Sequence, residues 1–360
     1  MSLTLTVDGE RWRQHLLATA EKHPGLVPVC KGNGYGFTLG RLARRAQWLD
    51  ERGHGVDTIA VGTYDELPHL ASRFDGDLLV LTPWRPFESA LEVDPALSGR
   101  LVHTLSRPED VRDLLARQPD ARFVLERLTS MQRHGLSARD LWAVAAELRS
   151  HPRARLEGIA FHLPLQQGSH VGEVHRLMTD VAGAELPDTP GARTIWVSHL
   201  TDAELAELRA AYPDFRLRPR IGTALWLGAR EAMRVTSTVL DVHPVSRGDA
   251  FGYRSRTAPK DGHLLIVSGG TAHGIGLEAP TGDSSIKARA GALARGGLDA
   301  VGFVRSPFST DGKQRLFAEP PHMQASMLFL PGGARVPQVG ELVDVRVRYT
   351  TTSFDRVVVA

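Results

Sequence analysis

Eight short apolar runs recur over about the first 220 residues, and stretches with helical spacing separate most of them. The runs cover residues 27–30, 58–61, 78–81, 101–105, 123–125, 156–161, 194–197 and 215–217. The helical stretches include residues 39–49, 108–115, 138–148, 172–183 and 202–211, and we expect Asp202 to cap the last of them. This alternation predicts an α/β protein with a (β/α)8 barrel of the TIM type. A doubly wound open sheet is the alternative that shares the same alternation.

The pattern changes after about residue 235, where helical spacing nearly vanishes. Residues 235–242, 263–267, 327–330 and 342–349 read as strands, with loops rich in Gly and Pro between them. The stretch 271–299 is rich in Gly and Ala and is expected to be a long loop of the kind that often carries function. The sequence therefore predicts a barrel domain over residues 1–235 and a mainly β domain over residues 236–360.

Composition excludes several classes of protein. The chain has 43 basic and 41 acidic residues and no run of like charges, so it has no footprint for nucleic acid. No apolar stretch approaches the ~18 residues that a membrane span needs, and the N-terminus does not resemble a signal peptide. Cys30 is the only cysteine, which excludes an internal disulfide and a cysteine-based metal cluster. We expect a cytoplasmic protein with no membrane partner.

Polar residues follow most of the predicted barrel strands. Active sites in such barrels lie at the C-terminal ends of the strands, so these residues are expected to converge. They are Lys31 after the first strand, Glu126 and Arg133 after the fifth, His162 after the sixth, Ser198 and His199 after the seventh, and Arg220 after the eighth. A lysine that closes a buried strand is costly unless it is paired or chemically used, and imine chemistry with an aldehyde cofactor is one such use. The alternative is a lysine that snorkels to the rim.

Five motifs carry a family resemblance. The segment Val27-Pro-Val-Cys-Lys31-Gly-Asn-Gly-Tyr35-Gly resembles the cofactor-lysine motif of the alanine racemases. Residues 129–135, 158–162, 220–225 and 248–253 resemble four further motifs of that family, in the same order along the chain. These enzymes use pyridoxal 5'-phosphate and combine a barrel with a C-terminal β domain. The resemblance therefore implies the same cofactor and the same two domains. We expect no metal site, because Asp57 and His103 have no companions at metal-ligand spacing.

The resemblance assigns roles to individual residues. Lys31 binds the cofactor covalently and acts as one catalytic base, and Tyr253 is the second base on the opposite face of the substrate. His162 lies against the pyridine ring, and Arg220 faces the ring nitrogen. Because arginine does not give up its proton, that nitrogen stays unprotonated, which limits side reactions. The remaining contacts to the cofactor come from Tyr35, Ser198, Gly222 and Thr223.

Several departures from the family concern substrate recognition. Glu126 stands where most members have a carboxylated lysine that positions the arginine matching Arg133, and a glutamate supplies the negative charge without modification. The segment 267–274 lacks the tyrosine that narrows the substrate entrance in the family. The Ser-Met-Asp turn aligns best with His322-Met323-Gln324, so its aspartate is missing too. Within the residues that follow Tyr349 we expect no counterpart of the family's last phosphate-contacting tyrosine.

These departures leave the substrate open. The resemblance implies a racemase acting on free alanine or on another amino acid, in a homodimer with shared active sites. Arg133, Glu126 and Met323 are the candidate substrate-binding residues, and His199, His273 and His322 are further candidates. Two alternatives remain: an enzyme of the same fold that is a decarboxylase, an aldolase or an epimerase of a larger or peptide-linked amino acid, and a non-catalytic pyridoxal-phosphate-binding protein.

Overall fold

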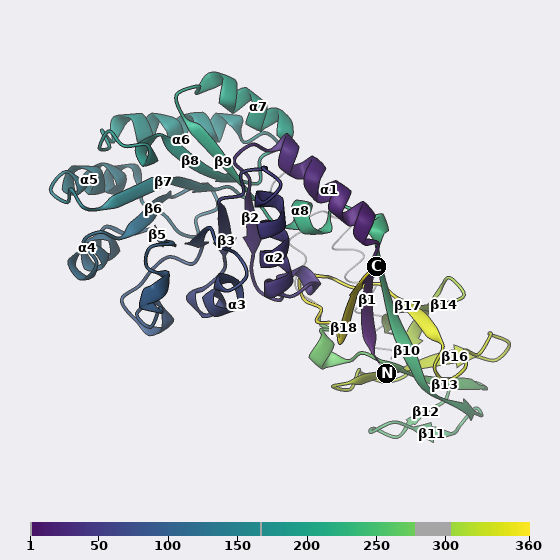
Figure 1. The fold of residues 1–360 in the computed structure, drawn as a ribbon. Helices are drawn as coiled ribbons and strands as arrows, with labels where there is room; N and C mark the ends of the chain where they lie inside the picture. The colour runs from purple at the N-terminus through teal and green to yellow at the C-terminus, as the bar shows by residue number, and fades with distance from the viewer. Residues whose placement is uncertain (1, 166–167, 278–303) are drawn as a thin grey trace. The chain divides into compact units, whose positions relative to one another are not determined.

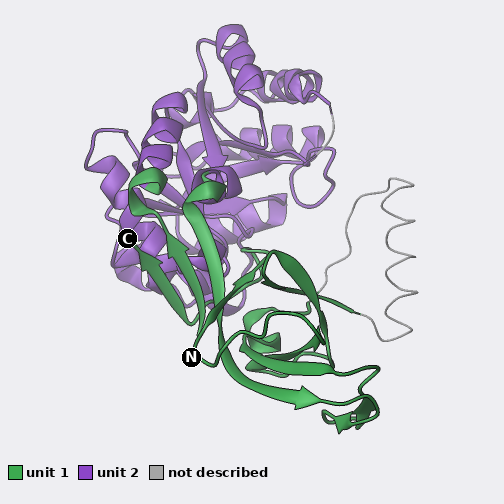
Figure 2. Ribbon diagram, turned by 90° about the vertical axis from the view of Figure 1, so that its right-hand side faces the viewer, with its two compact units in different colours: residues 1–12, 229–360 green, residues 13–228 purple. Residues whose placement is uncertain are grey.

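A computed structural model describes residues 2–165, 168–277 and 304–360 of the chain (Figure 1). The chain forms two compact units, one of residues 13–228 and one of residues 1–12 with 229–360 (Figure 2). We call them the barrel unit and the β unit. The division falls inside helix α1 (Gly9–Lys22), because the strand that precedes it pairs with two strands of the other part of the β unit, at residues 233–245 and 356–359.

The barrel unit contains eight parallel strands that close into a ring (Figure 1). They are β2 (Val27–Cys30), β3 (Thr58–Val61), β4 (Asp77–Val80), β5 (Leu101–Leu105), β6 (Arg122–Arg127), β7 (Arg155–His162), β8 (Thr194–Ser198) and β9 (Arg216–Ile221). Each strand overlaps one of the eight predicted apolar runs. The pairing of β2 with β9, in which Val27 lies opposite Arg220, closes the ring. The TIM-type barrel is confirmed, and the open sheet is excluded.

The helices of the barrel unit follow the strands in the expected order. They are α2 (Leu39–Asp50), α3 (Leu67–Ala71), α4 (Pro108–Arg117), α5 (Ala138–Leu148), α6 (Val171–Gly183), α7 (Asp202–Ala211) and α8 (Thr223–Leu227). The prediction that Asp202 caps α7 was wrong by one residue. Thr201 is the N-cap, because its hydroxyl accepts the Glu204 N–H while the Glu204 carboxylate accepts the Thr201 N–H. Among the described residues, no helix is long and apolar enough to cross a bilayer.

The barrel interior is filled by inward-facing apolar side chains. Buried residues from seven strands form this layer: Val27, Val29, Ala60, Leu79, Val102, Val124, Ala160 and Trp196. The eighth strand contributes Arg218 instead, whose guanidinium lies over the Trp196 ring at 4.3 Å and pairs with Asp57. The layer closes the barrel below the strand ends, so the polar residues that follow lie above an apolar floor.

The β unit is built around one sheet of eight strands. These are β1 (Leu3–Val7), β10 (Met233–Val245), β13 (Gly262–Ser268), β14 (Arg305–Thr310), β15 (Lys313–Phe317), β16 (Ala325–Pro331), β17 (Leu342–Val345) and β18 (Arg356–Val359). A small hairpin adds β11 (Ala250–Phe251) and β12 (Arg256–Thr257). Strand β10 pairs with both β17 and β13, so the sheet curls back on itself. The predicted mainly β character is confirmed.

Two sequence-based boundaries in the β unit differ from the structure. The strand expected over residues 342–349 ends at Val345. Within the stretch expected to be a long loop, residues 271–273 form a single helical turn, whereas residues 278–299 lie outside the described part of the chain.

Candidate active site

Alternation along the barrel strands explains why the predicted polar residues converge. Successive residues of a strand point to opposite faces, so a residue two places beyond an inward-facing one also faces the barrel interior. Five site residues stand two places beyond a residue of the inward layer: Lys31 after Val29, Glu126 after Val124, His162 after Ala160, Ser198 after Trp196, and Arg220 after Arg218. The barrel therefore gathers a lysine, a carboxyl, an imidazole, a hydroxyl and a guanidinium at one end.

Lys31 is held between two loops that a carboxylate ties together. The Glu66 carboxylate accepts the Gly32 N–H at 2.8 Å and the Gly62 N–H at 2.9 Å. Gly62 must lack a side chain, because a Cβ there would stand 2.9 Å from the Lys31 Cβ. Glu66 was not predicted from the sequence. It lies in a turn of helix beyond the strand end, where a solvated carboxylate is the ordinary expectation.

The amine of Lys31 lies in an electropositive setting. Burial lowers its pKa, and the neighbouring charges of Arg133 and Arg220 lower the pKa further, whereas Glu66 opposes the shift. A lowered pKa raises the fraction of neutral amine near neutral pH. The neutral amine is the form that attacks carbonyl carbons and accepts protons.

Tyr35 and Gly222 are in close contact. Tyr35 has a left-handed backbone conformation (φ 55°) and is buried, and burial raises the pKa of its hydroxyl. A Cβ atom on Gly222 would lie 2.1 Å from that hydroxyl oxygen. Gly222 precedes α8, and Thr223 is exposed beside it. The two residues line a small space, which we call the cradle, that a side chain at residue 222 would fill. Its walls are the protonated Tyr35 hydroxyl and the backbone at Gly222.

His162 is a neutral imidazole at the end of β7. Its Nδ1 lies 3.1 Å from the Ser198 hydroxyl, and its ring packs edge-on against His199 with 5.1 Å between centroids. Burial lowers the pKa of His162 to about 3, and the nearby charges of Arg220 and Arg133 contribute. The ring therefore stays uncharged over the physiological range and offers an apolar face with polar edges.

Arg220 and Glu126 are buried ionisable residues on strands β9 and β6. The Arg220 Nη2 donates to the Phe161 carbonyl at 3.0 Å, whereas its Nε is buried with no hydrogen-bond partner among the described residues. Burial lowers the pKa of Arg220 to about 10, so it keeps its charge at neutral pH. Burial raises the pKa of Glu126 to about 7, although Arg220 and Arg133 favour its ionised form.

The sequence led us to expect an ion pair between Glu126 and Arg133. Arg133 is exposed, and the two residues attract each other electrostatically. Among the described residues, however, no ion pair or hydrogen bond joins them, and Arg133 has no other such partner. The guanidinium of Arg133 is thus left to face solvent at the mouth of the barrel.

Two predicted site residues belong to the β unit. Tyr253 has an exposed fraction of 86% and Met323 one of 69%. Tyr253 follows Gly252, a left-handed position (φ 72°), and its N–H donates to the Glu319 carboxylate at 3.0 Å. Lys31 lies in the barrel unit. The structure brings together the barrel residues of the predicted site, whereas it describes Tyr253 and Met323 only within the β unit.

Two further histidines have local partners in the β unit. His273 is buried, accepts the Gly270 N–H at 3.2 Å and lies 3.0 Å from an Asp355 oxygen, so it supports the turn that holds it. His322 lies 2.6 Å from a carboxylate oxygen of Glu319. Glu319 was missed in the sequence because a glutamate followed by two prolines reads as a surface loop.

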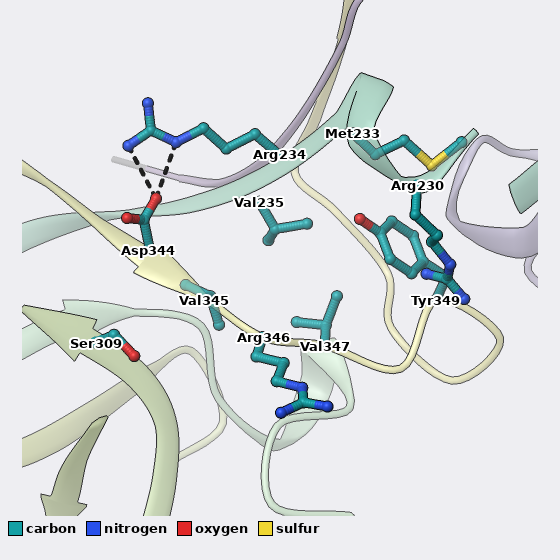
Figure 3. Close-up of a pocket in the computed structure, with 10 residues that line it drawn as sticks. All are labelled: Arg230, Met233, Arg234, Val235, Ser309, Asp344, Val345, Arg346, Val347 and Tyr349. Carbon is teal, nitrogen blue, oxygen red and sulfur yellow. Dashed lines mark hydrogen bonds and ion pairs between the residues drawn. The ribbon is translucent and has the colours of Figure 1, made fainter. Parts of the chain in front are cut away.

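The β unit also has a pocket of about 480 Å³ (Figure 3). Arg234 pairs with Asp344 at 2.9 Å on its wall, and the Arg230 guanidinium lies over the Tyr349 ring at 4.7 Å. None of the predicted site residues lines this pocket.

Comparison with known proteins decides the family. The family described as "Alanine racemase, N-terminal domain" matches residues 7–226, which include the whole set of barrel strands. The chain belongs to the alanine racemase family. An alanine racemase of Nitratidesulfovibrio vulgaris (strain Miyazaki F) is 26% identical over 269 residues, which are 69% of this chain and 69% of that protein.

Solved structures share the fold of the whole chain. Alanine racemase from Bartonella henselae, with covalently bound pyridoxal phosphate, superposes with a TM-score of 0.68 at 17% identity over 97% of this chain and 91% of that one. A histidine racemase from Leuconostoc mesenteroides gives 0.67 at 17% identity over 99% and 98%. The fold of this family thus accompanies more than one amino-acid substrate.

Proposed function

We propose that this chain is a pyridoxal-phosphate-dependent amino-acid racemase that uses Lys31 and Tyr253 as its two bases. The observation that carries the proposal is the ring of inward-facing residues around Lys31, with its lowered pKa, at the C-terminal end of the barrel. Its membership of the alanine racemase family supports the same reaction class.

The residues present fit the cofactor. Lys31 would hold it covalently, and Tyr35, Gly222 and Thr223 would hold the phosphate in a cradle that a Cβ on Gly222 would fill. The cradle supplies neutral donors, which suit an anion. The unpartnered Nε of Arg220 is a donor suited to the ring nitrogen. His162, held by Ser198, supplies an uncharged surface for the ring.

When bound, pyridoxal phosphate withdraws electrons from the Cα–H bond of an amino acid and so makes its proton removable. The neutral amine of Lys31 accepts that proton on one face. The Tyr253 hydroxyl gives a proton to Cα from the other face, which inverts the configuration. For the opposite enantiomer, Tyr253 accepts and Lys31 donates. Arg220 keeps its own proton and therefore orients the ring without protonating it.

We propose that each active site is shared between two copies of the chain. Lys31 belongs to the barrel unit and Tyr253 to the β unit, and the Tyr253 side chain is 86% exposed within one chain. A planar adduct needs one base on each face, and the barrel supplies only the lysine side. A homodimer with two-fold symmetry gives both sites the same pair of bases.

We propose a substrate larger than alanine, because the segment 267–274 lacks the tyrosine that narrows the entrance in the family. Among the described residues, Arg133 presents a free guanidinium that suits a carboxylate, and Glu126 is a buried carboxyl whose ionised form Arg133 favours. Met323 is exposed, and its carbonyl accepts the Ala272 N–H of that segment at 3.0 Å. The shared fold of a protein named as a histidine racemase supports this choice.

The proposal is tested by incubating the protein and pyridoxal phosphate with single enantiomers of a panel of amino acids, followed by chiral chromatography. We expect the other enantiomer to accumulate, fastest for substrates larger than alanine. Lys31→Ala should abolish the activity, whereas Lys22→Ala, at an exposed lysine paired with Asp202, should leave it unchanged. Loss of the carboxyl carbon, or cleavage of the side chain, would instead assign a decarboxylase or an aldolase.

A further inference from the structure

A buried carboxylate of the β unit contacts both Tyr253 and His322. The Glu319 side chain is 3% exposed. One of its oxygens accepts the Tyr253 N–H at 3.0 Å, and the other lies 2.6 Å from Nε2 of His322. The rings of His322 and Tyr253 are in turn 4.7 Å apart between centroids and inclined by 54°. The three residues therefore form a closed set of contacts.

Two glycines show that this arrangement is built into the backbone. A Cβ on Gly252 would stand 2.3 Å from the Glu319 carboxylate, so the turn before Tyr253 has room for that carboxylate only because residue 252 is glycine. A Cβ on Gly270 would stand 2.0 Å from the His322 carbonyl oxygen. The same carbonyl accepts the Thr271 N–H at 2.8 Å. The turn that carries His322 is thus held closely against residues 270–271.

We propose that Glu319 and His322 are positioning residues that fix the ring of Tyr253, an inference that rests on the proposed role of Tyr253 as a base. Among the described residues the Tyr253 hydroxyl has no hydrogen-bond partner. Its direction is therefore set by the backbone bond to Glu319 and by the contact with the His322 ring. The hydrogen bond to Glu319 holds the His322 ring in one orientation. The imidazole therefore gives the Tyr253 ring a fixed surface to pack against.

A fixed surface of this kind would raise the rate by keeping the Tyr253 hydroxyl in the right position. A base must reach the Cα proton within hydrogen-bond distance, and a misplacement of about 1 Å costs about 10²-fold in rate. An 86% exposed tyrosine with no contact to its ring would sample several rotamers. The contact with His322 removes this freedom before substrate arrives.

The first test uses the protein without cofactor or substrate. The chain has five tyrosines, so meta-fluorotyrosine labelling gives five fluorine NMR signals, and Tyr253→Phe identifies the one of interest. His322→Ala should move that signal toward the shift of a free tyrosine and narrow it. His243→Ala removes another histidine paired with a carboxylate in the same unit and should leave the signal unchanged. An unchanged signal in His322→Ala would overturn the proposal.

The second test uses the active enzyme. His322→Ala should lower kcat by about 10- to 100-fold with little change in KM, and His322→Phe, which keeps a ring but loses the hydrogen bond, should lie between it and wild type. With substrate deuterated at Cα, the isotope effect should rise in the direction in which Tyr253 removes the proton and fall in the other. Glu319→Ala should act like His322→Ala, and Glu319→Gln should restore part of the rate.

The outcomes separate this inference from the proposed function. Equal isotope effects in both directions, with an unchanged kcat, would show that His322 does not position Tyr253 although the enzyme racemises its substrate. A wild-type protein that binds no pyridoxal phosphate and racemises nothing would overturn the proposed function, while the fluorine signal would still report whether His322 holds the Tyr253 ring.

Discussion

The Tyr35 hydroxyl lies against Gly222 so closely that a Cβ at residue 222 would stand 2.1 Å from its oxygen. Strand β2 and the end of β9 bring the two residues together, because those strands pair where the barrel closes. Shifts of a few tenths of an ångström in the backbone or side chains do not relieve such an overlap. Any side chain at residue 222 therefore displaces the Tyr35 ring.

Gly222→Ala should therefore weaken binding of pyridoxal phosphate by at least about tenfold, which is the effect of losing one hydrogen bond to a charged group. A titration followed by the visible absorbance of the bound cofactor measures the change. Gly99→Ala is the matched control, because a Cβ at that glycine meets nothing within 4 Å. Equal affinities of wild type and Gly222→Ala would show that the phosphate binds elsewhere.

Stability should depend on pH through Glu126. Burial raises its pKa from 4.5 to about 7, so the folded state holds a proton that the unfolded state has lost between those values. The free energy of unfolding of wild type should fall as pH rises through this window, by about 3 kcal/mol in all, whereas Glu126→Gln should lack this slope. Denaturant titrations of both proteins at pH 5 and pH 8 measure it. A constant difference between the two proteins would contradict a buried, raised-pKa carboxyl.

Activity should also depend on the protonation of Glu126, but it should rise with pH where stability falls. The charged form of Glu126 attracts Arg133, so kcat/KM should rise with pH through about 7 in wild type and stay low and flat in Glu126→Gln. Glu126→Asp should keep part of the activity. Added bicarbonate should change none of these rates, because no lysine needs to be carboxylated. Equal activity of all three proteins would show that Glu126 has no part in orienting Arg133.

The barrel could be predicted because buried parallel strands are continuous apolar runs that local sequence reveals. Residues 27–30 and 58–61 coincide with β2 and β3 for this reason. Strand β1 was missed because its partners, β10 and β18, are more than 220 residues away along the chain. Nothing near Leu3 reports such a pairing.

The barrel part of the site was also predictable, since Lys31, His162 and Arg220 follow recognisable strands. Contacts made by carboxylates outside the strands were not. Glu66 and Glu319 each accept a backbone N–H from a distant turn, and a glutamate in a loop looks the same in sequence whether it is solvated or buried. The absence of an ion pair between Glu126 and Arg133 could not be predicted either. Strand order places both residues at the C-terminal end of the barrel, but it does not fix the distance between their side chains.

Sharing of the active site between two chains predicts complementation. Lys31→Ala and Tyr253→Phe should each be nearly inactive alone, since both sites of each dimer lack one base. After joint unfolding and refolding, about half of the dimers should be mixed, and each mixed dimer should have one intact site, so about a quarter of wild-type activity should return. Mixed dimers that form but stay inactive would place both bases in one chain's site.

The fate of the Cα proton distinguishes two-base racemisation from the other reactions of this fold. The protein should be incubated in deuterated water with one enantiomer of a substrate and pyridoxal phosphate, and the product examined by mass spectrometry and chiral chromatography. Two-base racemisation predicts that the inverted product has one deuterium at Cα and keeps its carboxyl carbon. Product that has lost the carboxyl carbon, or no exchange at Cα with any amino acid, would contradict the assignment of Lys31 and Tyr253 as the bases of a racemase.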